Sequence, residues 1–277
     1  MPFWKKKVEP EPEPEIAAAP PPAAAVPASP TSPAQSNGTP GTQGGADDEE
    51  SPFFGKKIDM SAFELCQTLG KGSFGHVMLV RKTDSGELLA MKVLQKRNLM
   101  KRQQVEHTRA ERSIMERIRG VPFLVHVRYA FQTVDKLFMV MDFMQGGELF
   151  FHLKKLGRFN ARAVQFYASQ MSLALEHLHS IDVIYRDLKP ENVLLGADGY
   201  LCLTDFGLSK EGIEGETEGA NSFCGTPEYV APEILKEGSK HGKGVDWWAM
   251  GTLLYEMLHG LPPFYSQNTA GNEMMRS

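Results

Sequence analysis

Two short segments set acidic, basic and amide side chains between runs of apolar residues. VIYRDLKPENVLL contains Asp187, Lys189 and Asn192, and YLCLTDFGLSK carries Asp205 at the end of an apolar run. Asn192 and Asp205 provide the oxygen atoms that Mg²⁺ prefers, and Asp187 is a carboxylate that can accept a proton from a hydroxyl. Lys189 is a compact cation that can follow the charge on a phosphoryl group. Each string arises often by chance, but their order and spacing together indicate a site for phosphate chemistry.

A glycine-rich segment upstream, LGKGSFGHV, has three regularly spaced glycines before a valine: Gly70, Gly72, Gly75 and Val77. Glycines let a backbone turn tightly and approach phosphates with no Cβ in the way. The spacing alone is weak evidence, because a Rossmann fold uses it and a plain glycine-rich hairpin also fits. A Rossmann loop leads from a strand into a helix, whereas HVMLVRK predicts a second strand here. This strand argues against a dinucleotide-binding oxidoreductase.

A single lysine, Lys92, lies in the middle of the apolar segment LLAMKVL. A lysine among apolar neighbours is most often one whose charged end reaches solvent. The alternative is a buried cation directed at phosphates, which requires a carboxylate partner. Glu111, in the helical segment VEHTRAERSIME, can supply that carboxylate, although alone it indicates only a solvated helix charge. The two residues become a functional pair only in combination.

The surrounding pattern predicts the elements that position these residues. Residues 63–69, 76–82 and 88–94 read as antiparallel strands joined by hairpins. A helix over about 105–119 follows, with Ile114, Met115 and Ile118 on one face, and then strands near 125–131 and 137–143. From Glu148 onward the pattern is mostly helical, with Gly146 and Gly147 at the joint. The sum is an α+β protein with a small β-rich lobe before a helical lobe.

In this order the segments resemble the signature of protein kinases. The resemblance extends from about Phe63 to the C-terminus and is closest to the AGC family of serine/threonine kinases, which includes cyclic-nucleotide-dependent kinase, protein kinase B and the ribosomal-protein kinases. The particular marks are Tyr185, where most kinases carry His before Arg-Asp, and the strings SFCGTPEYVAPE and VDWWAMG. The resemblance implies the bilobal kinase fold, with a helix αC in the small lobe, and an enzyme that uses ATP and Mg²⁺.

The resemblance also implies roles for individual residues. Lys92, oriented by Glu111, would bind the α and β phosphates, and Asn192 and Asp205 would hold Mg²⁺. Asp187 would act as base toward a serine or threonine hydroxyl, together with Lys189 and the bridging Thr226, which marks Ser/Thr rather than Tyr specificity. The nucleotide would be covered or bordered by further residues: Leu69, Gly70, Lys71, Gly72, Ser73, Phe74, Gly75, Val77, Ala90, Met141, Asp142, Met144, Glu148, Glu191 and Leu194.

Regulation is implied by the position of Ser222 in ANSFCG, which matches the activation-loop phosphosite. Phosphate there would add about −1.5 to −2 charge and strong hydrogen-bond acceptors. Arg186, Lys210 and His107 stand at the family positions that would meet it, although each alone indicates only an exposed charge. We therefore expect an upstream activating kinase.

Substrate preference is implied by Glu148, Glu191 and Glu256, which match family positions that form an acidic pocket for arginine. The expected partners are protein substrates with basic residues upstream of the acceptor, in particular arginine three residues upstream.

Composition narrows the class of protein. The net charge of −4 gives no electrostatic footprint for nucleic acid. The three cysteines, Cys66, Cys202 and Cys224, lack metal-ligand spacing and suit a reducing compartment. No apolar run reaches the length of about 18 residues that a membrane span needs. We expect a cytoplasmic location, with the nucleus as a further one.

The chain divides into two parts by composition. Residues 1–54 are rich in Pro, Ala and Glu and predict a disordered spacer tail, with an SH3 ligand as the alternative. Residues 55–277 form the expected kinase domain, divided into a small lobe and hinge over 63–144 and a large lobe over 145–277.

The resemblance implies a truncated chain, because family members continue past PPF with further helices and a tail that wraps onto the small lobe. The apolar segment 247–258 would then expose a patch, and Glu233 would lack the arginine that normally pairs with it. A pseudokinase or scaffold is the rival class. The presence of all five phosphate, metal and base residues argues against it: Lys92, Glu111, Asp187, Asn192 and Asp205.

Overall fold

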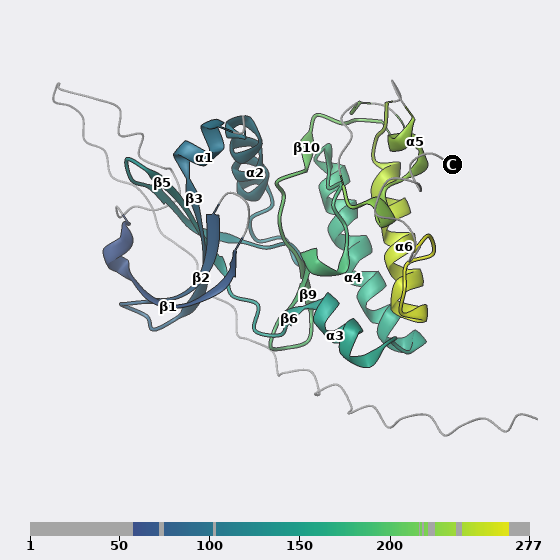
Figure 1. Ribbon diagram of the computed structural model, residues 1–277, viewed down its shortest axis with the longest axis horizontal. Helices are drawn as coiled ribbons and strands as arrows, with labels where there is room; N and C mark the ends of the chain where they lie inside the picture. The colour runs from purple at the N-terminus through teal and green to yellow at the C-terminus, as the bar shows by residue number, and fades with distance from the viewer. Residues whose placement is uncertain are drawn as a thin grey trace, which may run out of the picture. The chain divides into compact units, whose positions relative to one another are not determined.

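A five-stranded antiparallel sheet forms the first half of the described chain (Figure 1). The computed structural model describes residues 58–71, 75–101, 104–215, 217, 219–220, 225–236 and 240–265. The strands follow one another in space as β1-β2-β3-β5-β4. Their bounds are β1 (Phe63–Lys71), β2 (Gly75–Lys82), β3 (Leu88–Gln95), β4 (Val127–Gln132) and β5 (Lys136–Asp142). The α+β class and these strands are as the sequence predicts.

The two faces of this sheet carry different side chains, because residues alternate along each strand. Leu89, Met91 and Val93 of β3 point to the outer face. There they join a cluster, called here the outer-face cluster, made of Phe63, Val80, Leu89, Met91, Val93, Phe138 and Val140. Ala90 and Lys92 point to the opposite face, and Ala90 belongs to the main hydrophobic core there. Lys92 therefore points away from the outer-face cluster, although its neighbours in the sequence, Met91 and Val93, belong to that cluster.

Two helices lie between β3 and β4: α1 (Lys96–Lys101) and α2 (Val105–Arg117). The face predicted from the sequence is confirmed, since Ile114, Met115 and Ile118 are buried. The helix ends two residues earlier than predicted, because the chain turns at Ile118 and Gly120 has a φ of 79°. Glycine adopts this left-handed conformation without a steric cost.

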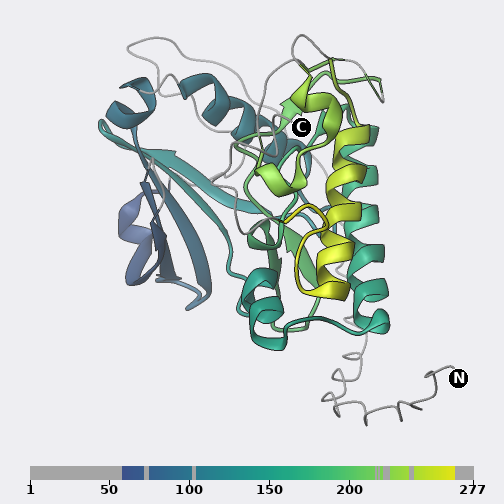
Figure 2. The same ribbon diagram turned by 45° about the vertical axis from the view of Figure 1, so that its right-hand side comes forward.

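The second half is mostly helical. It contains α3 (Leu149–Leu156), α4 (Ala161–Ser180), α5 (Pro232–Leu235) and α6 (Gly244–His259), and α4 lies beside α6 in both views (Figures 1 and 2). Asn160 caps α4 by accepting a hydrogen bond from the backbone N–H of Ala163. This half also contains two small sheets. One consists of β6 (Gly147–Glu148), β8 (Val193–Leu195) and β9 (Leu201–Leu203). In the other, β7 (Val183–Ile184) pairs with β10 (Lys210–Glu211). The described residues also contain three short 3₁₀ helices: η1 (Met60–Ala62), η2 (Pro190–Asn192) and η3 (Pro227–Tyr229).

The outward face of α6 is apolar, as expected. Trp247, Trp248, Tyr255 and Leu258 are each between 37% and 42% exposed. The predicted tail over residues 1–54 lies outside the described residues, and so do Ser222 and Cys224. In the described part of the chain, no helix combines the length and apolar composition needed to cross a bilayer.

Candidate active site

A short hairpin brings the two candidate metal ligands to neighbouring positions. Strands β8 and β9 pair antiparallel, with Val193 opposite Leu203. Asn192 directly precedes β8, and its carbonyl accepts a hydrogen bond from the N–H of Thr204 at 3.0 Å. Asp205 is the next residue and has a φ of 60°, a conformation that is uncommon for residues other than glycine and recurs at functional sites. The hairpin therefore places the side chains of Asn192 and Asp205 at one end.

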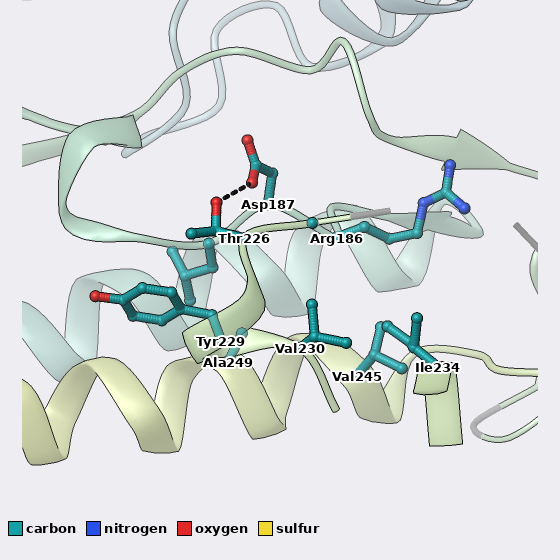
Figure 3. Close-up of a pocket in the computed structure, with 10 residues that line it drawn as sticks. Arg186, Asp187, Thr226, Tyr229, Val230, Ile234, Val245 and Ala249 are labelled. Atoms are coloured by element: carbon teal, nitrogen blue, oxygen red, sulfur yellow. Dashed lines mark hydrogen bonds between the residues drawn. The ribbon is translucent and has the colours of Figure 1, made fainter. Parts of the chain in front are cut away.

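Asp187 is the centre of a hydrogen-bond network. Its carboxylate accepts bonds from Lys189 Nζ at 2.9 and 3.0 Å and from Asn192 Nδ2 at 2.7 Å. Thr226 bridges the two charged residues: its hydroxyl donates to Asp187 at 3.4 Å (Figure 3). The same hydroxyl accepts a hydrogen bond from Lys189 at 3.0 Å. Because Asn192 commits its amide nitrogen to Asp187, its amide oxygen is the atom that suits a metal ion.

Lys92 forms an ion pair with a carboxylate, as expected for a buried cation directed at phosphates. Its Nζ lies 2.5 Å from Glu111 Oε1 and 3.6 Å from Asp205 Oδ1. The Glu111 side chain is only 5% exposed, so the pair lies largely away from water. Burial alone lowers the pKa of Lys92, but the carboxylates of Glu111 and Asp205 outweigh burial and raise that pKa above its ordinary value. Lys92 therefore stays a cation, next to one of the candidate metal ligands.

Three of the candidate nucleotide residues, Val77, Ala90 and Met141, share the face of the five-stranded sheet that carries Lys92. Val77 is the cross-strand partner of Lys92, and Ala90 is the partner of Met141. Met144 packs against the main core, and Leu194 pairs with Glu148 across β6 and β8. Asp142 ends β5, and Leu69, Gly70 and Lys71 end β1. Gly72, Ser73 and Phe74 lie outside the described residues.

Gly75 has a packing reason to be glycine. A Cβ at this position would lie 1.8 Å from the carbonyl oxygen of Val93, so any side chain would push β2 away from β3. At Gly70 the same Cβ would meet nothing within 4 Å. The glycines of this loop therefore serve different purposes, and Gly75 holds the strands that carry Val77 and Lys92 in close contact.

Sequence reasoning missed the residue that fixes the loop bearing Asp187. Asp246, at the start of α6, is completely buried and accepts hydrogen bonds from the N–H groups of Tyr185 and Arg186 at 2.9 and 2.7 Å. It also contacts His179 Nε2 at 2.7 Å. Arg186 has a φ of 67°, so these bonds hold a conformation that few residues adopt. The only available signal was an aspartate within the apolar segment VDWWAMG.

A second missed cluster ties the C-terminal end of α2 to β10. Glu211 Oε1 accepts hydrogen bonds from Arg117 at 2.9 Å and from Ser113 at 3.2 Å. Arg117 also donates to the carbonyl of Ile181 at 2.7 Å. Since α2 carries Glu111, these bonds help to fix the helix in the position that pairs Glu111 with Lys92.

The three residues expected to meet a phosphate on Ser222 each have a different local environment. Ser222 itself lies outside the described residues. Arg186 Nε donates to the carbonyl of Leu208 at 2.7 Å, and Lys210 Nζ lies 3.5 Å from the carbonyl of Gly219. His107 is exposed on α2, where its ring contacts Gln104 at 2.8 Å.

The three candidate acidic residues lie around η2. Glu191 belongs to η2, which packs against β6, the strand that ends at Glu148. Glu256 is buried and accepts a hydrogen bond from the Tyr229 hydroxyl. Burial raises the pKa of Glu256, and the charges of Glu191 and Glu228 raise it further, against the effect of the Tyr229 bond. Glu256 is therefore a buried acid whose surroundings include the charges of Glu191 and Glu228.

Known proteins have sequences similar to that of this chain. The family model described as the protein kinase domain matches residues 63–277. The chain is 53% identical over 225 residues to the RAC family serine/threonine-protein kinase homolog of Dictyostelium discoideum, covering 81% of this chain and 50% of that one. It is 50% identical over 208 residues to the human serine/threonine-protein kinase Sgk2, covering 75% of this chain and 56% of Sgk2. The corresponding values for human ribosomal protein S6 kinase alpha-4 are 52% over 213 residues, with 76% and 28% covered.

The chain spans about half the length of the first relatives it matches. Within that span the kinase model covers the sheet, the α2 helix, the Asp187 network and α6. The chain therefore belongs to the protein kinase domain family, and within it to the serine/threonine kinases of the AGC type.

Proposed function

We propose that this chain transfers a phosphoryl group from ATP to serine or threonine hydroxyls of proteins, and that it acts in intracellular signalling. The observation that carries the proposal is the single network in which Asp187 contacts Lys189, Asn192 and Thr226. A carboxylate held by a cation and a hydroxyl suits the transfer of a proton from an acceptor hydroxyl.

Each residue has a defined task in this reaction. Asp187 takes the proton of the acceptor hydroxyl, and Lys189 stabilises the charge that develops on the transferred group. Lys92, kept cationic by Glu111, positions the phosphates of the nucleotide. The oxygen atoms of Asn192 and Asp205 suit Mg²⁺, which when bound neutralises charge on the phosphates. The hydroxyl of Thr226 bonds both Asp187 and Lys189, and so holds these two side chains in fixed positions relative to each other while the acceptor binds.

Phosphate transfer from ATP to a serine peptide tests the proposal directly. The chain is incubated with ATP, Mg²⁺ and the peptide, beside an Asp205→Ala variant. We expect incorporation by the unchanged chain and a loss of at least about a hundredfold in the variant, because the variant lacks a metal-binding carboxylate. Nucleotide binding without any transfer by the unchanged chain would contradict the proposal and favour a non-catalytic binding protein.

We further propose a preference for arginine three residues upstream of the acceptor, supported by the buried Glu256 beside Glu191. Glu256→Gln keeps an acceptor for Tyr229 but removes the charge. We expect the ratio of kcat/KM for an arginine peptide over its alanine counterpart to fall about tenfold, which corresponds to about 1.4 kcal/mol. Glu176→Gln, on the exposed side of α4, is the control and should leave the ratio unchanged.

The arginine preference should also depend on pH. The pKa of Glu256 is raised above 4.5, so the proton returns to this carboxyl at a higher pH than to an ordinary glutamate. Only the ionised form attracts a guanidinium group, so the preference is complete at high pH and declines as the pH falls through that raised pKa. Glu256→Gln should lack this decline. Equal pH profiles for the variant and the unchanged chain would contradict the assignment.

We propose that phosphorylation of Ser222 by an upstream kinase activates the chain. Arg186 and Lys210 supply the cations that support the proposal, since a phosphate near them would form charge-assisted hydrogen bonds. We expect treatment with an activating kinase to raise the initial rate at least about tenfold, and Ser222→Ala to abolish that rise. Thr217→Ala, in the same segment, is the matched control. Full activation of the Ser222→Ala variant would disprove the assignment.

A further inference from the structure

A groove with a volume of about 390 Å³ opens on the outer face of the five-stranded sheet. Its main walls are six apolar side chains: Met60, Leu65, Met78, Met91, Val93 and Phe138. Because Met91 and Val93 flank Lys92 in β3, this groove lies on the opposite face from the candidate active site. Its volume falls in the range of about 300–1,000 Å³ that is typical of ligand pockets.

The chemistry of the walls suits an aromatic side chain. Three of the six wall residues are methionines, whose flexible and polarisable thioethers adapt to the shape of a ring and form favourable sulfur–aromatic contacts. Among the described lining residues, the charged and titratable ones are His76, Asp135 and Lys136. Asp135 lies in the turn between β4 and β5, and Lys136 is the first residue of β5.

The chain enters the sheet beside this groove. Ile58 packs against the outer-face cluster, and Met60, two residues later, is one of the groove walls. The seven residues directly before Ile58 are SPFFGKK, which contain Phe53 and Phe54. Two adjacent aromatic residues therefore precede the point where the chain reaches the apolar groove.

The length of this segment fits the groove. Three residues separate Phe54 from Ile58, and the four Cα-to-Cα steps between them reach about 14 Å in an extended chain. The groove walls run from β1 to β5, which is three strand spacings or about 14 Å. Phe53 and Phe54 can therefore reach Met78 and Met91, at the centre of the groove, without any change in the sheet.

We propose that Phe53 and Phe54 occupy this groove, so that the segment before β1 docks on the outer face of its own sheet. Closing a loop of a few residues costs little conformational entropy, and the cost rises with loop length. The more distant aromatic pair, Phe3 and Trp4, would have to close a loop of about fifty residues. An intramolecular segment also has an effective concentration in the millimolar range, above that of a second copy. The inference is independent of phosphoryl transfer.

Methyl resonances of the methionines provide the test, because ring currents shift any methyl group beside an aromatic ring. In the full chain, Phe53→Ala combined with Phe54→Ala should shift the methyl signals of Met60 and Met78 and lower the melting temperature by on the order of 5 °C. Phe3→Ala combined with Trp4→Ala is the matched control, and it should change neither signal nor melting temperature.

A substitution in the groove provides the reciprocal test. Leu65 is 54% exposed, so Leu65→Arg is compatible with the fold while it places a charge in the groove. It should reproduce the methyl shifts, and adding the two Phe53 and Phe54 substitutions to it should lower the melting temperature no further. Val134→Arg, on a side chain 91% exposed in the neighbouring turn, should leave both measurements unchanged.

Three results would each overturn the proposal. Unchanged methyl signals in the Phe53 and Phe54 variant would show that these rings do not enter the groove. Shifts caused by the Phe3 and Trp4 variant instead would assign the groove to the more distant pair. Signals that depend on protein concentration would assign it to a second copy. None of these measurements requires kinase activity, so their failure is distinguishable from failure of the proposed function.

Discussion

Replacing Asp187 with asparagine is expected to lower kcat by about 10²- to 10⁴-fold, which is the usual contribution of a general base. Asparagine has the same shape and can still accept hydrogen bonds from Lys189 and Thr226, but it cannot take up the proton of the acceptor hydroxyl. The KM for ATP should change by no more than about twofold, since Lys92 and Asp205 are untouched.

Initial rates measured over a series of ATP concentrations at saturating peptide give both kcat and the KM for ATP, and so check this prediction. Asp198→Asn is the matched control, because Asp198 is an exposed aspartate whose side chain accepts only from the N–H of Tyr200 among the described contacts. That control should keep the full rate. If Asp187→Asn retained more than about a tenth of the rate, another group would have to act as the base.

Replacing Asp246 with alanine is expected to have the largest effect on stability. The substitution removes the acceptor for the N–H groups of Tyr185 and Arg186 and the partner of His179. A buried donor without a partner costs about 1–3 kcal/mol, so the free energy of unfolding should fall by at least about 3 kcal/mol. Total stabilities of about 5–15 kcal/mol make this a large fraction of what holds the domain folded.

Urea unfolding followed by circular dichroism measures this loss. Asp246→Asn keeps one carbonyl oxygen and should lose less stability than alanine, whereas Asp198→Ala should change the free energy of unfolding by less than about 0.5 kcal/mol. The fraction that remains folded in the Asp246 variants should also have a lower kcat, because the bonds to Tyr185 and Arg186 fix the loop that carries Asp187. A stability within 1 kcal/mol of the unchanged chain would contradict the role of Asp246.

Most elements of the sheet could be predicted because their signals are local. Strands β1, β2 and β3 are short segments rich in apolar residues and bounded by turn residues, so each pattern is complete within about nine residues. Taken separately, Lys92 and Glu111 each fit an ordinary solvated charge as well as a functional residue. The structure pairs them because the side chain of Lys92 on β3 and the side chain of Glu111 on the buried face of α2 point toward each other. Resemblance to a family added what the local pattern lacked, namely the reason to consider the two together.

The contacts that hold the site in place could not be predicted in the same way. Asp246 is defined by bonds to residues about 60 positions earlier, and its own segment indicates only an apolar helix. Glu211 and Arg117 are 94 positions apart, and each alone resembles an ordinary surface charge. Such pairs depend on how α6 and α2 pack against the rest of the domain, and no short sequence window contains both partners.

The dependence of the Asp187 loop on Asp246 has a consequence for synthesis of the protein. Ribosomes add about 5–20 residues per second, and Arg186 is made 60 residues before the carboxylate that fixes its N–H group. For about 3–12 seconds the nascent chain therefore carries Asp187 on a loop without its anchor. The order of translation delays assembly of the site until α6 has emerged, so an unfinished polypeptide lacks the geometry for transfer even after Asp187, Lys189 and Asp205 have all been translated.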